Sequence, residues 1–261
     1  MWLLHRSIDG DIKLVEFPQG HAPKYAILSH KWLADEDKVS FQLMGSGPPE
    51  PDDVRCNKIH FCVEQAAKDG LDYCWVDTCC IDKSSFAPIE ESIRNIYYWY
   101  RDAEKCYVYL SDVSTGDADS VEEACREEWE AGFRGSTWFT RIWTLQEVLA
   151  PKEVEVFSAE GVWLGNKMTL ETLLYEKMGV PRQVLRGADM ATFAIEEKLS
   201  WGKDRQTGCV EDMAYGILGL FDVTAMELRY GEGSQALVRL PEEAEKREAE
   251  LGVEYLDGVY L

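Results

Sequence analysis

The sequence of 261 residues has no long hydrophobic run and no excess of basic residues. No apolar run approaches the ~18 residues that a membrane-spanning helix needs, so we expect no membrane span. Lysine and arginine together number 27, against 48 aspartates and glutamates, which gives a net charge of −21. A surface this acidic repels nucleic acid and anionic lipid, so neither is an expected partner.

Signals for secretion and metal binding are also scarce. Residues 1–6 (MWLLHR) have no basic leader, and their apolar stretch is too short for a signal peptide. The 8 cysteines include no Cys-x-x-Cys pair, so we expect reduced thiols and a cytoplasmic protein. Cys56, His60 and Cys62 have a spacing that zinc can use, but they lie in a predicted helix without a second cluster. Buried thiols are the better interpretation, and we expect no metal and no cofactor.

Short apolar runs alternate with amphipathic helical patterns as far as residue 157. The predicted strands are 25–28, 73–76, 106–110 and 154–157, and the predicted helices between them are 59–66, 89–100 and 143–149. This alternation predicts an α/β fold with a mainly parallel sheet flanked by helices. Asp9-Gly10 predicts an N-terminal β-hairpin. From residue 165 the pattern is helical, with predicted helices at 193–201 and 213–221.

Five motifs resemble those of the fungal heterokaryon-incompatibility (HET) domain, and they occur in the family's order. They are YAILSHKW at 25–32, WVDTCCIDK at 75–83, WFTRIWTLQE at 138–147, EDMAYGILGLFD at 211–222 and YGEG at 230–233. The family usually has glycine where Ile142 stands and arginine where Cys209 stands. The resemblance predicts a HET domain over 1–240, with an α/β core at 25–157 and a helical extension at 165–240. Residues 241–261 then form an acidic C-terminal tail.

The resemblance implies a role in cell death. HET domains trigger death when genetically different fungal cells fuse, and they are similar to TIR domains. The order of strand 106–110, Ser136, Trp138 and the segment 143–147 is similar to the TIR pattern of strand, serine and a Trp-Cys-Leu-x-Glu helix. In enzymatic TIR domains the glutamate of that helix cleaves NAD. The resemblance therefore implies a TIR-like (flavodoxin-like) sheet, NAD as substrate and Glu147 as the catalytic residue.

The chemistry of NAD cleavage agrees with a single glutamate. Breaking the nicotinamide–ribose bond leaves an oxocarbenium-like ribosyl cation, which one carboxylate can stabilise. Nicotinamide is already a good leaving group, so no second carboxylic acid is needed to protonate it. Trp143 and Glu147 are four residues apart on one helix face and can line one pocket. We expect Glu147 to lie in an open cleft; a surface helix glutamate is the alternative.

Substrate-binding candidates follow the predicted strands, because parallel sheets bind ligands at the carboxyl ends of their strands. Ser29, His30 and Trp32 follow the first strand, and Trp32 can stack on nicotinamide or adenine. A loop histidine and a core tryptophan are the alternatives for His30 and Trp32. Asp77 follows the second strand and can bind ribose hydroxyls, as can Asp82, which can equally cap the next helix.

Two further features of the sequence are ambiguous. Arg141 can bind the pyrophosphate of NAD, or it can compensate the negative charge of the acidic segment 117–130. We expect that segment to be a solvated helix or loop. Cys79 and Cys80 form no convincing catalytic pair, because no histidine has a pairing signal.

Two functions therefore remain open. The first is an NAD-consuming effector that is switched on by self-association into a homo-oligomer, with an upstream sensor protein as a possible partner. The alternative is a non-enzymatic death-signalling module that acts by self-association.

Overall fold

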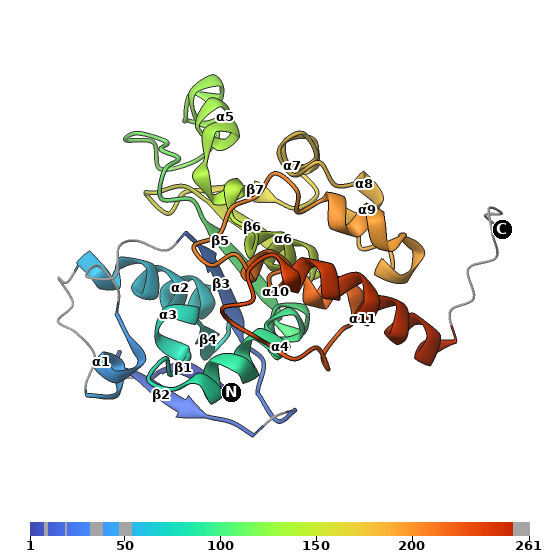
Figure 1. The fold of residues 1–261 in the computed structure, drawn as a ribbon. Helices are drawn as coiled ribbons and strands as arrows, with labels where there is room; N and C mark the ends of the chain where they lie inside the picture. The colour runs from blue at the N-terminus through green and yellow to red at the C-terminus, as the bar shows by residue number, and fades with distance from the viewer. Residues whose placement is uncertain (8–9, 19, 32–38, 47–53, 253–261) are drawn as a thin grey trace.

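Seven strands form one mixed sheet in the computed structural model of the protein, which describes residues 1–7, 10–18, 20–31, 39–46 and 54–252 (Figure 1). The strands are β1 (Trp2–Arg6), β2 (Ile12–Glu16), β3 (Ala26–His30), β4 (Tyr73–Trp75), β5 (Lys105–Tyr109), β6 (Val154–Phe157) and β7 (Trp163–Asn166), in the order β2-β1-β4-β3-β5-β6-β7. The helices are α1 (Phe41–Gly45), α2 (Asn57–Lys68), α3 (Asp77–Cys80), α4 (Phe86–Asp102), α5 (Arg126–Gly135), α6 (Thr144–Leu149), α7 (Glu171–Met178), α8 (Arg182–Leu185), α9 (Ile195–Ser200), α10 (Asp212–Tyr215) and α11 (Gln235–Leu251). Short 3₁₀ turns are η2 (Val54–Cys56), η3 (Thr137–Thr140), η4 (Met190–Thr192) and η5 (Leu218–Phe221).

The centre of the sheet is parallel and its edges are antiparallel. Strands β4, β3, β5 and β6 run in parallel, which confirms the predicted α/β fold with a mainly parallel sheet flanked by helices. The pairs β1–β4 and β6–β7 are antiparallel. Strand β7 was not predicted from the sequence, because its four residues include Gly165 and give only a short alternating pattern. The chain passes from β3 to β4 on one side and then to β5 on the other, so the strand order reverses at β3.

Helices cover both faces of this sheet because the central strands are apolar on both sides. Tyr107 and Tyr109 of β5 contact Phe61 of α2. Cys106, one residue before Tyr107, points to the other face, where its thiol contacts the Glu147 carbonyl of α6 at 3.5 Å. Alternation along one strand therefore assigns α2 and α6 to opposite faces. Figure 1 shows α4 and α6 together on one side of the sheet.

The predicted N-terminal hairpin is present as β1 and β2, which pair from Trp2 with Glu16 to Arg6 with Ile12. Leu3 and Leu4 of β1 are neighbours on opposite faces of the strand, and both are fully buried. Of the predicted turn, Asp9 lies outside the described residues, and Gly10 has a φ of +91°, a value that favours glycine.

The helical C-terminal part packs on the sheet's α4 side. The predicted helix 213–221 is in fact two short pieces, α10 and η5, because the backbone leaves helical geometry at Ile217. Gly219 of η5 lies directly on Tyr97 of α4, where an added Cβ would be 2.1 Å from the Tyr97 Cβ. Helix α11 runs from Gln235 to Leu251 without a break at residue 240, so that boundary falls inside a helix.

The acidic segment begins as turns and becomes helix α5 from Arg126, in agreement with the two alternatives for it. No disulfide bond joins any of the 8 cysteines, all of which lie within the described residues. Within that same part of the chain, no helix combines the length and the hydropathy required to cross a bilayer.

Candidate active site

Glu147 of α6 lies under the carboxyl end of β3 and is 7% exposed. The Ser29 hydroxyl of β3 donates a hydrogen bond to Glu147 Oε2. The Trp138 indole Nε1 in turn donates to Ser29 Oγ, with 2.9 Å between the two atoms. This indole bond directs the serine proton toward the glutamate, so Trp138 and Ser29 hold the carboxyl group in one orientation.

Burial determines the protonation of Glu147. It raises the pKa of this carboxyl group to about 8, and the negative charge of Asp77 acts in the same direction. The hydrogen bond from Ser29 and the positive charge of Arg141 oppose the increase. The folded protein therefore holds Glu147 mostly protonated at neutral pH. Glu147 is buried and does not lie in the expected open cleft. Sequence periodicity placed it on a helix face but did not reveal that β3 covers that face.

His30 ends β3 beside Asp77, which begins α3 after β4. His30 Nδ1 is 3.8 Å from Asp77 Oδ1. Burial lowers the pKa of His30 to about 4, and the nearby Asp77 carboxylate only partly offsets this effect. The imidazole is therefore neutral at physiological pH, and it can exchange hydrogen bonds with a ligand without adding charge.

A cavity of about 210 Å³ brings five of the predicted site residues together. They are His30, Asp77, Arg141, Trp143 and Glu147. Isoleucines of α4 form its apolar wall. Ser29 lies behind Glu147, fully buried, and reaches the cavity only through it. Trp32 lies outside the described residues, so its predicted contact with a ligand stays a prediction.

The sequence analysis did not name four polar residues that line this cavity, Lys83, Ser92, Asp212 and Tyr230. Asp212 of α10 lines it, and its Oδ2 accepts a hydrogen bond of 3.3 Å from Trp143 Nε1. Tyr230 lines it as well and donates to Asp212 Oδ1 at 2.8 Å. Burial raises the pKa of Asp212. Asp212 and Tyr230 belong to the motifs at 211–222 and 230–233, but sequence order alone does not connect them with Trp143.

Comparison with known proteins identifies the family of this chain. The profile of the heterokaryon incompatibility protein (HET) family matches residues 25–147, a range that ends at Glu147. The chain is also 44% identical over 248 residues to the vegetative incompatibility protein HET-E-1 of Podospora anserina. The chain carries a HET domain. The aligned region is 94% of this chain but only 18% of that relative. No solved structure matches the chain.

The helical extension of this HET domain holds Tyr230 in place. The buried Glu211 carboxylate accepts hydrogen bonds from the backbone N–H groups of Gly231 at 2.7 Å and Gly233 at 2.8 Å. The Cys209 thiol donates to the same carboxylate at 3.1 Å, at the position where the family usually has arginine. Both donors are glycines because their backbone is in a conformation that favours glycine, with φ values of +100° at Gly231 and +64° at Gly233.

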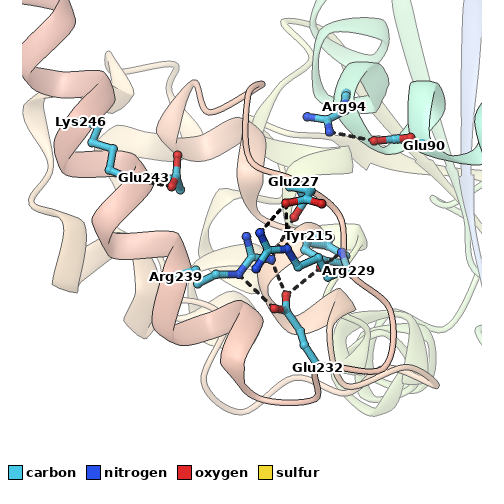
Figure 2. Close-up of polar contacts among 9 residues, drawn as sticks. All are labelled: Glu90, Arg94, Tyr215, Glu227, Arg229, Glu232, Arg239, Glu243 and Lys246. Carbon is cyan, nitrogen blue, oxygen red and sulfur yellow. Dashed lines mark hydrogen bonds and ion pairs between the residues drawn. The ribbon is translucent and has the colours of Figure 1, made fainter.

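Helix α11 secures the other side of this segment, as Figure 2 shows. Arg239 of α11 pairs with Glu232 and donates through Nη2 to the Glu227 carbonyl at 2.9 Å. The Tyr215 hydroxyl of α10 donates to Glu232 at 3.1 Å and accepts from the Arg229 backbone N–H at 2.7 Å. We call residues 227–233 the strap. Helices α10 and α11 therefore fix the strap, and the strap carries Tyr230 to the cavity.

Other candidate residues have structural explanations. Cys79 and Cys80 are buried. The interaction with Cys80, together with burial, raises the pKa of the Cys79 thiol, which makes it a poor nucleophile. Asp82 accepts from the Ser84 backbone N–H at 2.9 Å, in the turn before α4, and does not line the cavity. Among the described residues, no group of three His, Cys, Asp or Glu side chains has the arrangement of a metal site.

Proposed function

We propose that this HET domain is a cell-death effector of the vegetative incompatibility type and that it acts by hydrolysing the nicotinamide–ribose bond of NAD. The name of the relative from Podospora anserina supports the biological role. The observation that supports the chemistry is a buried glutamate in a small cavity, facing an aromatic ring and a guanidinium group.

The sheet topology supports similarity to TIR domains. The parallel strands lie side by side in the order β4-β3-β5-β6. Numbered by their sequence among the parallel strands, this spatial order is 2-1-3-4, which is the order of flavodoxin-like sheets. Such sheets bind ligands at the carboxyl ends of their strands. His30 and Asp77 occupy those ends on β3 and β4, and both line the cavity with Glu147.

Glu147 becomes the reactive carboxylate when the substrate enters. The nicotinamide ring of NAD is cationic, and a cation beside a buried carboxyl group lowers its pKa. The proton of Glu147 then leaves to water. As the glycosidic bond breaks, its electron pair goes to the nicotinamide nitrogen, and the carboxylate stabilises the ribosyl cation that remains. Water adds to that cation and loses a proton.

The other cavity residues have complementary roles. Trp143 offers a ring face for nicotinamide, and its bond to Asp212 fixes the orientation of the indole. His30 and Asp77 can hold the ribose hydroxyls, and Arg141 can meet the pyrophosphate. A cavity of 210 Å³ is below the roughly 300–1,000 Å³ that encloses a drug-sized ligand, so it holds the nicotinamide end only. The adenosine end of NAD then lies outside it.

A second candidate function is a death-signalling module that acts by self-association without catalysis. The protonated state of Glu147 favours it, because a neutral carboxyl group that is hydrogen-bonded to Ser29 is stable in the interior without any substrate. In that case Glu147 and Ser29 join β3 to α6, and the cavity is only a gap in packing.

Incubation of the purified domain with NAD separates the two functions. The enzymatic function predicts that the parental domain releases nicotinamide and that Glu147→Gln releases it roughly a hundredfold more slowly or worse. This decrease corresponds to a loss of about 3 kcal/mol of transition-state stabilisation. Glu197→Gln, on the exposed face of α9, is the matched control and should cleave at the parental rate. Absence of nicotinamide release at every protein concentration tested, together with killing by Glu147→Gln in cells, would establish the signalling module instead.

A further inference from the structure

A second and larger cavity lies beside the amino end of β6, away from the candidate active site. Its volume is about 780 Å³. It is lined by α4, α9, η5 and the segment that leads into β6, and it shares no lining residue with the cavity at Glu147. This volume is within the range of about 300–1,000 Å³ that is typical of small-molecule sites.

Lys198 of α9 places an ammonium group in the wall of this cavity. The residue is only 2% exposed. Its Nζ is 3.8 Å from Glu248 Oε1, beyond hydrogen-bond distance, and 4.8 Å from the centroid of the Phe221 ring. Within the described residues, no acceptor is hydrogen-bonded to Nζ. A buried ammonium whose carboxylate partner lies beyond hydrogen-bond distance has N–H donors to offer to an acceptor that reaches it.

Lys167 adds a second buried ammonium group to the same cavity. It is 6% exposed, and its Nζ donates to the Pro151 carbonyl at 2.6 Å and to the Val148 carbonyl at 3.4 Å. These two bonds leave one of its three N–H donors available. Burial lowers the pKa of both lysines, and the nearby carboxylates, Glu248 and Asp189 for Lys198 and Glu153 for Lys167, offset this effect only in part.

The wall also carries the carboxylates of Glu153, Asp189, Asp222 and Glu248. The Asp222 carboxylate and the Arg186 guanidinium are already engaged. Asp222 accepts from Arg247 at 2.7 Å and from the Tyr98 hydroxyl. Arg186 forms two bonds to Glu171, which lies outside the cavity lining, at 2.6 and 2.9 Å. Lys198 and Lys167 are therefore the buried cations of this wall that have donors to offer.

We infer that this cavity, which we call the lysine cavity, binds a small phosphorylated organic molecule, with Lys198 and Lys167 donating to its phosphate oxygens. Lysine binds phosphate as a point charge, and two ammonium groups match the charge of a phosphate monoester dianion. The apolar part of the wall, which includes Leu149, Leu185 and Leu220, covers the organic part of the ligand.

Lys198 also has a structural alternative, in which it only joins α9 to α11 through Glu248 and to η5 through Phe221. The two interpretations predict different behaviour for Lys198→Met, which keeps the length of the side chain and removes its charge. A structural clamp predicts a lower melting temperature without ligand. A ligand site predicts an unchanged or higher melting temperature, because a buried charge without a hydrogen-bonded partner has been removed. It also predicts loss of the ligand's effect.

The experiment measures melting temperature and binding heat with AMP, inorganic phosphate and adenosine as probes. For the parental domain, AMP at a hundredfold excess over its Kd should raise the melting temperature by roughly 5–10 °C, and adenosine should not. Lys198→Met and Lys167→Met should each weaken AMP binding tenfold or more. Lys203→Met, at an exposed position of the same region, should bind AMP like the parent.

Three outcomes would overturn the inference. One is the absence of any shift with AMP or phosphate in the parental domain at about 10 mM. Another is equal affinity of AMP for the parent and Lys198→Met, which would place binding elsewhere. If Lys198→Met fails to fold, Lys198→Arg replaces it in the test, because it keeps the charge and should bind AMP within a few-fold of the parental affinity. The third outcome is a folded Lys198→Arg variant that has lost AMP binding. Glu147→Gln should bind AMP at the lysine cavity unchanged, which separates this test from that of NAD cleavage.

Discussion

Replacement of Glu147 by glutamine should make the domain more stable than the parent, by an amount that grows as the pH rises, even though it removes the proposed catalytic group. The folded domain raises the pKa of Glu147 from 4.5 to about 8, chiefly by burial. The unfolded chain releases this proton near pH 4.5, whereas the folded chain keeps it until near pH 8. The raised pKa therefore has no effect on stability below the unfolded pKa, and it lowers stability progressively as the pH rises from there toward the folded value.

The size of the effect follows from the two pKa values. The difference destabilises the parental domain by about 1 kcal/mol at pH 5 and about 3 kcal/mol at pH 7, with a plateau near 5 kcal/mol above pH 8. Glutamine is neutral throughout and lacks this destabilisation. The gain at neutral pH corresponds to a rise in melting temperature of roughly 6–12 °C for a domain of this size. If the new amide finds no acceptor, a constant cost of about 1–3 kcal/mol is subtracted.

The pH dependence is therefore the decisive quantity. We would measure chemical denaturation of the parent, Glu147→Gln and the exposed control Glu197→Gln between about pH 5 and 9. The stability of Glu147→Gln relative to the parent should grow by about 2–3 kcal/mol between pH 5 and 7, whereas Glu197→Gln should follow the parent. A difference that stays constant over this range would mean that Glu147 is ionised in the folded domain, and the argument from burial would be wrong.

The remaining predictions concern activity and packing. The kcat/KM for NAD should rise with pH up to about 8 and then level off, because the free domain must lose the Glu147 proton; a flat profile between about pH 6 and 9 would refute this requirement. Specific activity should fall on dilution if the effector needs self-association, as light scattering and nicotinamide release together can test; undiminished turnover by a strict monomer would contradict it. Gly219→Ala should destabilise the domain by about 1–3 kcal/mol or more, because its Cβ would overlap Tyr97, whereas Gly135→Ala, with open space around its Cα, should change stability little in the same denaturation assay.

The sequence was sufficient to predict the local elements and the chemistry-bearing residue types. Short apolar runs predicted β3, β4, β5 and β6, because buried parallel strands need apolar side chains on both faces. Helical periodicity predicted α2 and α4. The strand-end rule then placed His30 and Asp77 near Glu147, and the cavity contains all three.

Only the tertiary structure could decide the features that depend on contacts between distant segments. Asp212 reaches Trp143 from α10, and Tyr230 reaches Asp212 because Glu211 and α11 hold the strap in place. No local pattern encodes these contacts. The protonation of Glu147 depends on how completely β3 and α6 exclude water from it. The lysine cavity likewise joins Lys167 and Lys198, which are 31 positions apart in the sequence. Periodicity reports which face of an element is apolar, whereas charge, burial and cavity volume depend on what the rest of the chain places against that face.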